Sequence, residues 1–519
     1  MSTFTPRSTT LMLRSVPESK FTKYGKFAKS ISHDSSIDLF ARSPISKAIK
    51  APHFNLIEYP SNHVYLTLDS MKNAGLRPRS YNTVIVCLDI RQDDRRGAID
   101  KYTNLLRVAT QIARERIALI YSDDSYSITD VSVGAKLSKT DPFQIEKEVL
   151  RLVYRNDPWA YNRELNSLEF KYKRVILESK PIFGGVCLTD RCNLRCDFCS
   201  KESQGKLQRR PLDDYKNLSE MFIGTVCTWQ MDMFGEATEH PDFIEAVEWV
   251  DGKINESASI SINTNGNLLT KDIVEVVRVS KFARVNVSLN SPDERTYELI
   301  MKGGSYNKVL NGVRSLVKAR DDSKANSFKV SLSMILTEDT LGESEDFITL
   351  GENLGVDEVI IRALHLYPIS VFDDIKQRYL EQIASTKDLV ETVRKIEKRK
   401  SKSKIKVLFS PENVIWTNNL SRQVMFNNKT LLDMAGELPV EFDQPLKCSL
   451  PWSSFVNPTN DNRFSVCCFV LPFGLLTGDA PEYNFDDLWN GDMYQKLRRD
   501  IGGESSPHPC RAQVCRAIS

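Results

Sequence analysis

Cys192, Cys196 and Cys199 stand within eight residues, in the spacing C-x3-C-x2-C. They follow an apolar run, Pro181 to Leu188, of the kind that forms a buried strand. In a chain without a secretory signal, clustered thiols indicate metal binding or catalysis more than disulfides. Three thiolates in one short loop can hold three corners of an iron–sulfur cube. One iron would keep an open coordination position, which is the mark of a site that does chemistry.

The region after this strand predicts a parallel α/β fold, because apolar strand-like runs alternate with helical stretches. Six such strands with helices between them indicate right-handed crossovers. In barrels of this kind the chemistry lies at the carboxyl ends of the strands, where the three cysteines fall. The expected strands are Ile182–Leu188, Thr225–Phe234, Ser259–Thr264, Val285–Asn290, Lys329–Leu336 and Glu358–Ala363, and the expected helices are Pro241–Val250, Lys271–Val279, Asn307–Ala319 and Glu345–Leu354.

Short polar motifs close several of these strands. Phe234-Gly235-Glu236-Ala237 ends the second, Asn263-Thr264-Asn265-Gly266 ends the third, and Ser288 and Asn290 end the fourth. Together with the cysteine spacing and Phe198, the aromatic residue before the last cysteine, these motifs resemble the radical S-adenosylmethionine (radical SAM) superfamily. The family usually has Gly-Gly-Glu-Pro at these four positions. This chain has Phe234 in place of the first Gly and Ala237 in place of the Pro, which affects the fine geometry of the turn.

The resemblance implies a partial (β/α)6 TIM-like barrel over residues 178–370, a [4Fe-4S] cluster held by the three cysteines, and SAM on the open iron. Such a cluster, reduced by a partner such as flavodoxin or ferredoxin, cleaves SAM to methionine and a 5′-deoxyadenosyl radical. A zinc loop is the alternative interpretation of the cysteines alone. The resemblance assigns cofactor binding to Phe198, Gly235, Glu236, Asn263, Asn265, Ser288 and Asn290.

A second group of cysteines occupies the last 72 residues of the sequence. Cys448 and Pro451-Trp452 precede a hairpin-like stretch, Val456 to Ser465, and the arrangement resembles the twitch domain, a short relative of the SPASM extension. The resemblance implies an auxiliary [4Fe-4S] cluster, while the thiols alone also allow structural zinc. Cys468 is the alternative to Cys467 as a cluster ligand, and it is also the candidate donor of a hydrogen atom to the substrate. The expected ligands are Cys448, Cys467, Cys510 and Cys515.

Composition limits the remaining possibilities. The 519 residues predict two to four domains, and a net charge of +2 argues against bulk electrostatic binding of nucleic acid. No apolar run is long enough to span a membrane, so we expect a soluble, cytoplasmic protein. The basic first thirty residues indicate a disordered tail or a transit peptide. The expected domains are a tail and irregular segment at 1–80, a small α/β domain at 81–155, the core at 178–370, a helical linker at 371–445 and the auxiliary domain at 446–519.

These observations leave three hypotheses for function. The first is a radical SAM enzyme that oxidises or epimerises a small molecule such as a sugar, aminocyclitol or nucleoside. The second is a maturase of a ribosomally made peptide, for which the domain at 81–155 could capture substrate. The third, from a different class, is an iron–sulfur protein that transfers electrons without catalysis.

Overall fold

The chain folds into two compact units, residues 1–168 and residues 169–519. The second unit contains the cysteine-bearing loop. The residues that this computed structural model describes are 10–14, 37–42, 54–59, 81–89, 103, 113–122, 126–132, 142–199, 207–323, 328–364, 382, 386–410, 414, 448–460, 464–467 and 485–501.

The first unit contains a six-stranded sheet in the order β3-β2-β1-β4-β5-β6. Neighbouring strands are parallel except β5 and β6, which are antiparallel. Helix α5 (Pro142–Val153) follows the sheet, and helix α6 (Pro158–Lys171) runs on into the second unit. The strands are β1 (Thr10–Arg14), β2 (Ile37–Arg42), β3 (Phe54–Tyr59), β4 (Tyr81–Asp89), β5 (Ala113–Ser122) and β6 (Tyr126–Ser132).

Residues 1–80, expected as a tail followed by irregular or short elements, contain the short strands β1, β2 and β3. Strand β1 lies inside the sheet, between β2 and β4, so this sheet begins at residue 10 rather than at 81. These strands have five or six residues each, too few for a clear sequence period, and pairing with their neighbours defines them. The spacing of Ile99, Tyr102, Leu106, Ala109 and Ala113 by three and four residues predicts a helix. Ala113 instead begins β5, and most of that stretch lies outside the described residues.

The second unit is built on an open sheet of eight strands in the order β13-β12-β11-β10-β9-β8-β7-β14. All of these neighbours pair in parallel, which confirms the partial TIM-like barrel. The count of six is corrected, because one short strand is added at each edge. The strands are β7 (Phe183–Val186), β8 (Thr228–Gln230), β9 (Ser259–Thr264), β10 (Phe282–Ser288), β11 (Lys329–Leu336), β12 (Glu358–Ala363), β13 (Lys406–Leu408) and β14 (Ser454–Asn457).

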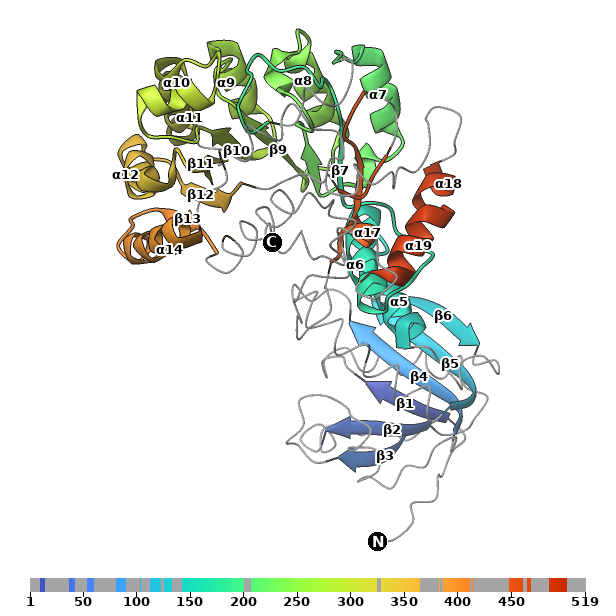
Figure 1. Cartoon of the computed structure of the whole chain (residues 1–519). Coiled ribbons are helices and arrows are strands. Elements are labelled where there is room, and N and C mark those ends of the chain that lie inside the picture. Colours follow the sequence, from blue (N-terminus) through green and yellow to red (C-terminus); the bar gives the residue numbers. More distant parts are fainter. Residues whose placement is uncertain are drawn as a thin grey trace. The chain divides into compact units, whose positions relative to one another are not determined.

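Helices between the strands pack on one face of this sheet, as Figure 1 shows for α8 to α12. Val287 on β10 lies beside Val309 on α11, both close to Gly266, and Val359 on β12 lies beside Gly351 on α12. Apolar side chains of the strands therefore fill the space under the helices. The helices are α7 (Leu212–Glu220), α8 (Phe243–Lys253), α9 (Lys271–Val279), α10 (Glu294–Ile300), α11 (Tyr306–Asp322), α12 (Ser344–Leu354) and α14 (Thr386–Lys400), with short 3-10 turns at Ile223–Thr225, Ala237–Glu239 and Leu341–Glu343.

The carboxyl-terminal segment docks on the edge of the sheet through β14, which pairs with β7. Helix α17 (Leu450–Ser453) leads into β14. Phe485 of α18 (Phe485–Trp489) packs on Phe455 of β14, and Tyr494 of α19 (Asp492–Asp500) donates a hydrogen bond to Ser454 O. An antiparallel bridge between Val456 and Ser465 confirms the expected hairpin-like stretch. The indole of the buried Trp452 donates to Arg174 O, and the indole of the buried Trp489 donates to Ser179 O.

Arg498 on α19 is the polar centre of this docked segment. Its side chain is 2% exposed, and burial lowers the pKa of its guanidinium to about 10. The guanidinium donates to the carbonyls of Pro451, Val175 and Trp489, at 2.8, 3.0 and 2.9 Å. One charged fork thus links three segments that are far apart in the sequence.

Replacing Arg498 with Met should lower the free energy of unfolding by about 3 kcal/mol, because several buried carbonyls lose their donor. Arg499→Met, at an exposed neighbour on the same helix, is the matched control and should stay within about 0.5 kcal/mol of wild type. Denaturant unfolding measures both. Equal stability of the two variants would contradict this role for Arg498.

Candidate functional site

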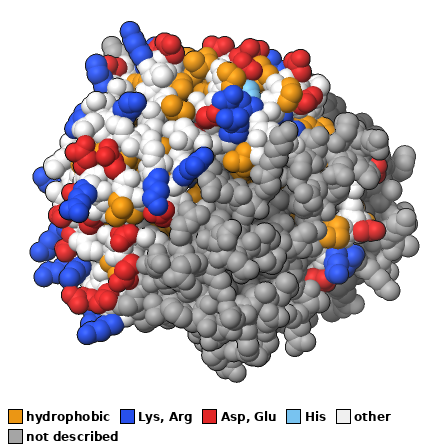
Figure 2. Space-filling view, turned by 45° about the horizontal axis from the view of Figure 1, so that its top comes forward, with side chains coloured by type: hydrophobic (Ala, Val, Ile, Leu, Met, Phe, Trp, Pro, Cys, Tyr) orange, Lys and Arg blue, Asp and Glu red, His pale blue; other side chains and the backbone are white. Residues whose placement is uncertain are grey.

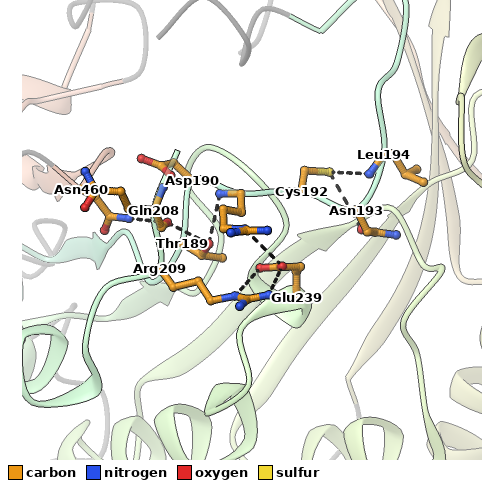
Figure 3. A network of polar contacts seen from close by, with 10 residues as sticks. Thr189, Asp190, Cys192, Asn193, Leu194, Gln208, Arg209, Glu239 and Asn460 are labelled. Carbon is orange, nitrogen blue, oxygen red and sulfur yellow. Dashed lines mark hydrogen bonds and ion pairs between the residues drawn. The ribbon is translucent and has the colours of Figure 1, made fainter. Parts of the chain in front are cut away.

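The base of the cysteine loop is a network of polar contacts at the end of β7 (Figure 3). Thr189 and Arg209 form an antiparallel bridge, and the Thr189 hydroxyl donates to Gln208 O at 3.1 Å. The Asp190 carboxylate accepts from the backbone N–H of Gln208, and burial raises the pKa of Asp190. Glu239 pairs with the guanidinium of Arg209 and lies 3.5 Å from that of Arg191. The chain thus enters the loop from a fixed base.

Segments that follow other strands contact the loop itself. The backbone N–H of Glu236, after β8, donates to Arg191 O at 2.8 Å. After α10, Lys302 O accepts from the backbone N–H of Arg195 at 2.9 Å, and the Lys302 ammonium pairs with Asp197 at 2.5 Å. Because parallel strands end at one edge, these segments converge on the three cysteines.

Gly235 makes its close contact with the loop because it has no side chain. Its φ is +92°, and a Cβ placed on it would lie 2.5 Å from Arg191 O and 2.8 Å from Thr189 O. No other residue type fits this backbone at this separation. The Gly predicted from the motif thus has a defined steric role.

The carboxylate of Glu236 holds the end of β9. Glu236 is 2% exposed, and it accepts from the backbone N–H of Asn265 at 2.6 Å and from the hydroxyls of Thr264 and Thr238 at 2.8 and 2.6 Å. Burial raises the pKa of Glu236, and these hydrogen bonds oppose the rise. The Asn265 amide then donates to Asn193 Oδ1 at 2.8 Å and lies 3.7 Å from Cys192 Sγ. Glu236 therefore positions a donor beside the first cysteine.

Asn290, at the end of β10, has a left-handed backbone with φ of 63°. Its side-chain carbonyl accepts from the backbone N–H of Ile335 at 3.0 Å, and its amide lies 3.2 Å from the sulfur of Met301. Met301 Sδ in turn lies 3.4 Å from Cys196 Sγ. The Asn290 side chain thus uses both of its polar atoms on the protein, and Met301, which the sequence motifs did not indicate, packs against a cysteine of the loop.

Asn263 and Ser288, two more of the expected SAM contacts, lie on the face of the sheet opposite the helices. Asn263 donates to the Asp232 carboxylate, from its backbone N–H at 2.5 Å and from Nδ2 at 2.9 Å. Burial raises the pKa of Asp232 to about 6, and these hydrogen bonds oppose the rise. Sequence reasoning missed Asp232, although an acidic residue inside an expected apolar strand was a signal for it.

The donor set of the loop fits an iron–sulfur cluster. Cys192 and Cys196 are partly buried and Cys199 is exposed, and the Leu194 N–H lies 3.4 Å from Cys192 Sγ. N–H groups beside thiolate sulfur stabilise its charge. Among the described residues no three His, Cys, Asp or Glu side chains already gather as a metal site. Ligand side chains commonly take their final geometry when metal binds.

Only two of the carboxyl-terminal cysteines lie in described parts of the chain. Cys448 precedes α17 and Cys467 follows the Val456–Ser465 bridge, both partly buried. Burial raises the pKa of the Cys448 thiol, while the Leu450 N–H opposes the rise. Cys468, Cys510 and Cys515 lie outside the described residues, so the choice between Cys467 and Cys468 stays a prediction.

The family model of the Radical SAM superfamily matches residues 186–350. This range begins at the end of β7, includes the cysteine loop and the strand-end segments that contact it, and ends within α12. Residues 186–350 form a radical SAM domain. Radical SAM proteins bind a [4Fe-4S] cluster and SAM, and the three cysteines of this domain are the residues that would hold the cluster.

Curated relatives align with part of the chain at low identity. A probable GTP 3′,8-cyclase of Saccharolobus islandicus is 26% identical over 214 residues, which cover 39% of this chain and 66% of the relative. The GTP 3′,8-cyclase of Listeria welshimeri is 30% identical over 170 residues, covering 32% and 47%. The chain thus spans less than two thirds of the length of either relative.

Solved structures with similarity to the chain include SuiB of Streptococcus suis bound to the precursor peptide SuiA and anSMEcpe with bound AdoMet. SuiB has a TM-score of 0.46 at 14% identity, with 73% of this chain and 75% of SuiB covered. The anSMEcpe structure has a TM-score of 0.44 at 14% identity, with 65% and 91% covered.

Gly235→Ala should disturb the cysteine loop, because the added methyl group meets the backbone of residues 189–191 and φ is positive. We expect a loss of more than about 2 kcal/mol of stability and a lower iron content after anaerobic reconstitution. Gly224→Ala is the matched control, since its Cβ would have no atom within 4 Å. Wild-type iron content and stability in Gly235→Ala would contradict this role.

Proposed function

We propose that this chain is a radical SAM enzyme that removes a hydrogen atom from a small, polar molecule, for oxidation or epimerisation. The observation that carries the proposal is the cysteine loop, which is contacted by the segments after β8, β9 and α10 within the radical SAM domain. An electron-transfer protein needs a cluster but has no need of this convergence of strand ends. When bound and reduced, the cluster and SAM supply the hydrogen-abstracting radical.

The residues of the chain would position the reacting groups and fix the loop. Gly235 allows the turn after β8 to lie against the loop, and Glu236 directs Asn265 toward Cys192. Asn263 and Ser288 offer polar groups on the open face of the sheet for SAM. Gly235, Glu236, Asn265 and Asn290 hold the edge at which SAM would bind, and Phe198 lies in the loop between the last two cysteines.

The proposal of a small molecule as substrate has two supports. The relatives are named for a reaction of GTP, a small, polar nucleotide. The open face of the sheet also carries polar side chains, including Asp232, Asn263 and Asn286, which suit a polar ligand better than an apolar one. A peptide is the alternative substrate class, and a reducing partner such as flavodoxin or ferredoxin is required in either case.

We further propose an auxiliary [4Fe-4S] cluster in the carboxyl-terminal segment, with Cys448, Cys467, Cys510 and Cys515 as ligands. The position of Cys448 and Cys467 on either side of the β14 hairpin supports the first two. With four thiolates this cluster would have no open iron, which suits electron transfer and favours substrate oxidation. Cys468 is the candidate hydrogen donor if the outcome is epimerisation.

The first experiment tests SAM cleavage. The anaerobically reconstituted, dithionite-reduced protein should form 5′-deoxyadenosine from SAM, and a Cys192/Cys196/Cys199→Ala variant should form none. Small-molecule and peptide fractions of a cell extract are then compared for stimulation, and we expect the small-molecule fraction to be active. Absence of 5′-deoxyadenosine while electron paramagnetic resonance shows an intact reduced cluster would refute the enzyme proposal.

Metal analysis tests the two-cluster proposal separately. Reconstituted wild type should hold about eight iron atoms per chain, and Cys448/Cys467→Ala about four, because a [4Fe-4S] cluster contains four irons. The Cys192/Cys196/Cys199→Ala variant should also keep about four. Zinc in place of this remaining iron, or loss of all iron from that variant, would count against an auxiliary iron–sulfur cluster.

A further inference from the structure

Strands β9, β10 and β11 have two unlike faces. Toward the helices they present apolar side chains that are at most 2% exposed: Ile262, Val285, Val287, Leu332 and Met334. The opposite face carries Asn263, Asn286, Ser288 and Ser333, and all but Asn286 keep part of their surface accessible. A sheet that served only as a packed core would be apolar on both faces. We call this second face the polar face.

One chain of hydrogen bonds crosses the polar face. Asn263 Nδ2 donates to the Asp232 carboxylate at 2.9 Å, and Asn263 Oδ1 accepts from Asn286 Nδ2 at 3.0 Å. The same Asn286 amide donates to Ser333 Oγ at 3.1 Å, which lies 3.4 Å from Ser288 Oγ. The strand register agrees with this order, since Asn286 pairs with Asn263 and Ser288 with Ser333.

The carboxylate of Asp232 fixes the direction of this chain. An ionised carboxylate only accepts hydrogen bonds, so Asn263 has to present its amide nitrogen to Asp232 and its oxygen to Asn286. Asn286 then has to present its nitrogen to Asn263, because two carbonyl oxygens do not bond. The Asn286 oxygen is therefore left outside this series of hydrogen bonds. With a pKa of about 6, Asp232 is ionised at neutral pH and keeps this direction.

Asn286 Oδ1 consequently has no hydrogen-bond partner within the described residues, although Asn286 is only 4% exposed. A buried acceptor without a donor costs about 1–3 kcal/mol, and such groups in native proteins call for an explanation. Flipping the Asn286 amide would not remove this cost, because Asn286 Oδ1 would then face Asn263 Oδ1, and two acceptors cannot form a hydrogen bond. A ligand that supplies a donor to this oxygen removes it.

We propose that Asn286 Oδ1 is the acceptor of a substrate subsite on the polar face, which recognises a hydroxyl or amino group of a polar small molecule. This inference rests on the proposed function, and it adds the group through which the substrate is recognised. Asn286 lies two residues before Ser288 on β10, about 7 Å further from the cysteine loop. The subsite is thus displaced along the strand from the end where SAM is expected. Asp232 acts as a positioning residue, because it orients the acceptor through Asn263.

The test compares Asn286→Ala with wild type in the anaerobic SAM-cleavage assay, with the small-molecule fraction of a cell extract as the probe. We expect the amount of extract needed for half-maximal stimulation to rise about tenfold, the effect of losing one good hydrogen bond. The SAM concentration for half-saturation should stay at the wild-type value. Asn311→Ala, at an exposed position of α11, is the matched control and should behave as wild type.

Asp232→Asn tests the orientation directly. The new asparagine would keep its side-chain oxygen toward the Asn263 backbone N–H and turn its amide nitrogen toward the Asn263 side chain. The Asn263 amide then has to flip so that its oxygen accepts this hydrogen bond, and the Asn286 amide has to flip in turn. Asn286 would then present its nitrogen, a donor, in place of its oxygen. We expect the same loss of stimulation from this variant, although its shape is nearly unchanged. If thermal melting shows that Asn286→Ala does not fold, Asp232→Asn alone is compared with wild type.

The outcomes separate the possibilities. Equal stimulation of wild type and both variants overturns the subsite, because the acceptor then makes no contact with the substrate. A matching rise in the SAM requirement assigns the acceptor to SAM and also overturns it. Stimulation by the peptide fraction alone, or by neither fraction, overturns the small-molecule class. Absence of 5′-deoxyadenosine from wild type is a different result, because it overturns the proposed function and the subsite falls with it.

Discussion

The site depends on one constraint, which is that parallel strands bring their carboxyl ends to the same edge of a sheet. In the second unit every pair of neighbouring strands is parallel, so loops that are far apart in the sequence meet beside Cys192. The contacts at this edge are short-range and specific: a glycine that lacks a side chain, a buried carboxylate that holds a backbone N–H, and an amide beside a sulfur. Each contact depends on the register of strands that are themselves fixed by apolar packing under the helices.

Much of this arrangement could be predicted from the sequence, because its elements are long and bounded by turn residues. Strands β9, β11 and β12 and helix α9 begin and end at the predicted residues. The edge strands β13 and β14 were missed, since three or four residues carry no measurable period. Their strand character comes from the neighbour to which they pair, and a single sequence does not show that neighbour.

The candidate site also has one part that the sequence predicts and another part that it does not. The cysteine loop and the strand-end motifs are local patterns, and the structure places Gly235, Glu236 and Asn265 against that loop. The contact of Met301 with Cys196 joins residues more than a hundred positions apart, and no local pattern indicates it. The sequence also gives no indication of the donor-to-acceptor direction of the hydrogen bonds that link Asp232 to Asn286. It follows from strand register combined with the donors and acceptors of each side chain, and neither is apparent from polar residues within a strand.

The pairing of β14 with β7 has a geometric consequence for the two groups of cysteines. Cys192 lies beyond the carboxyl end of β7, whereas Cys448 lies beyond the amino end of β14. The bridge between Val456 and Ser465 turns the chain back, so that Cys467 also lies toward the amino end of β14. Because the two strands are parallel, the cysteine loop and the two described cysteines Cys448 and Cys467 belong to opposite ends of one strand pair. In the proposed two-cluster arrangement, an electron exchanged between the clusters would travel along the strands, over a distance set by strand length.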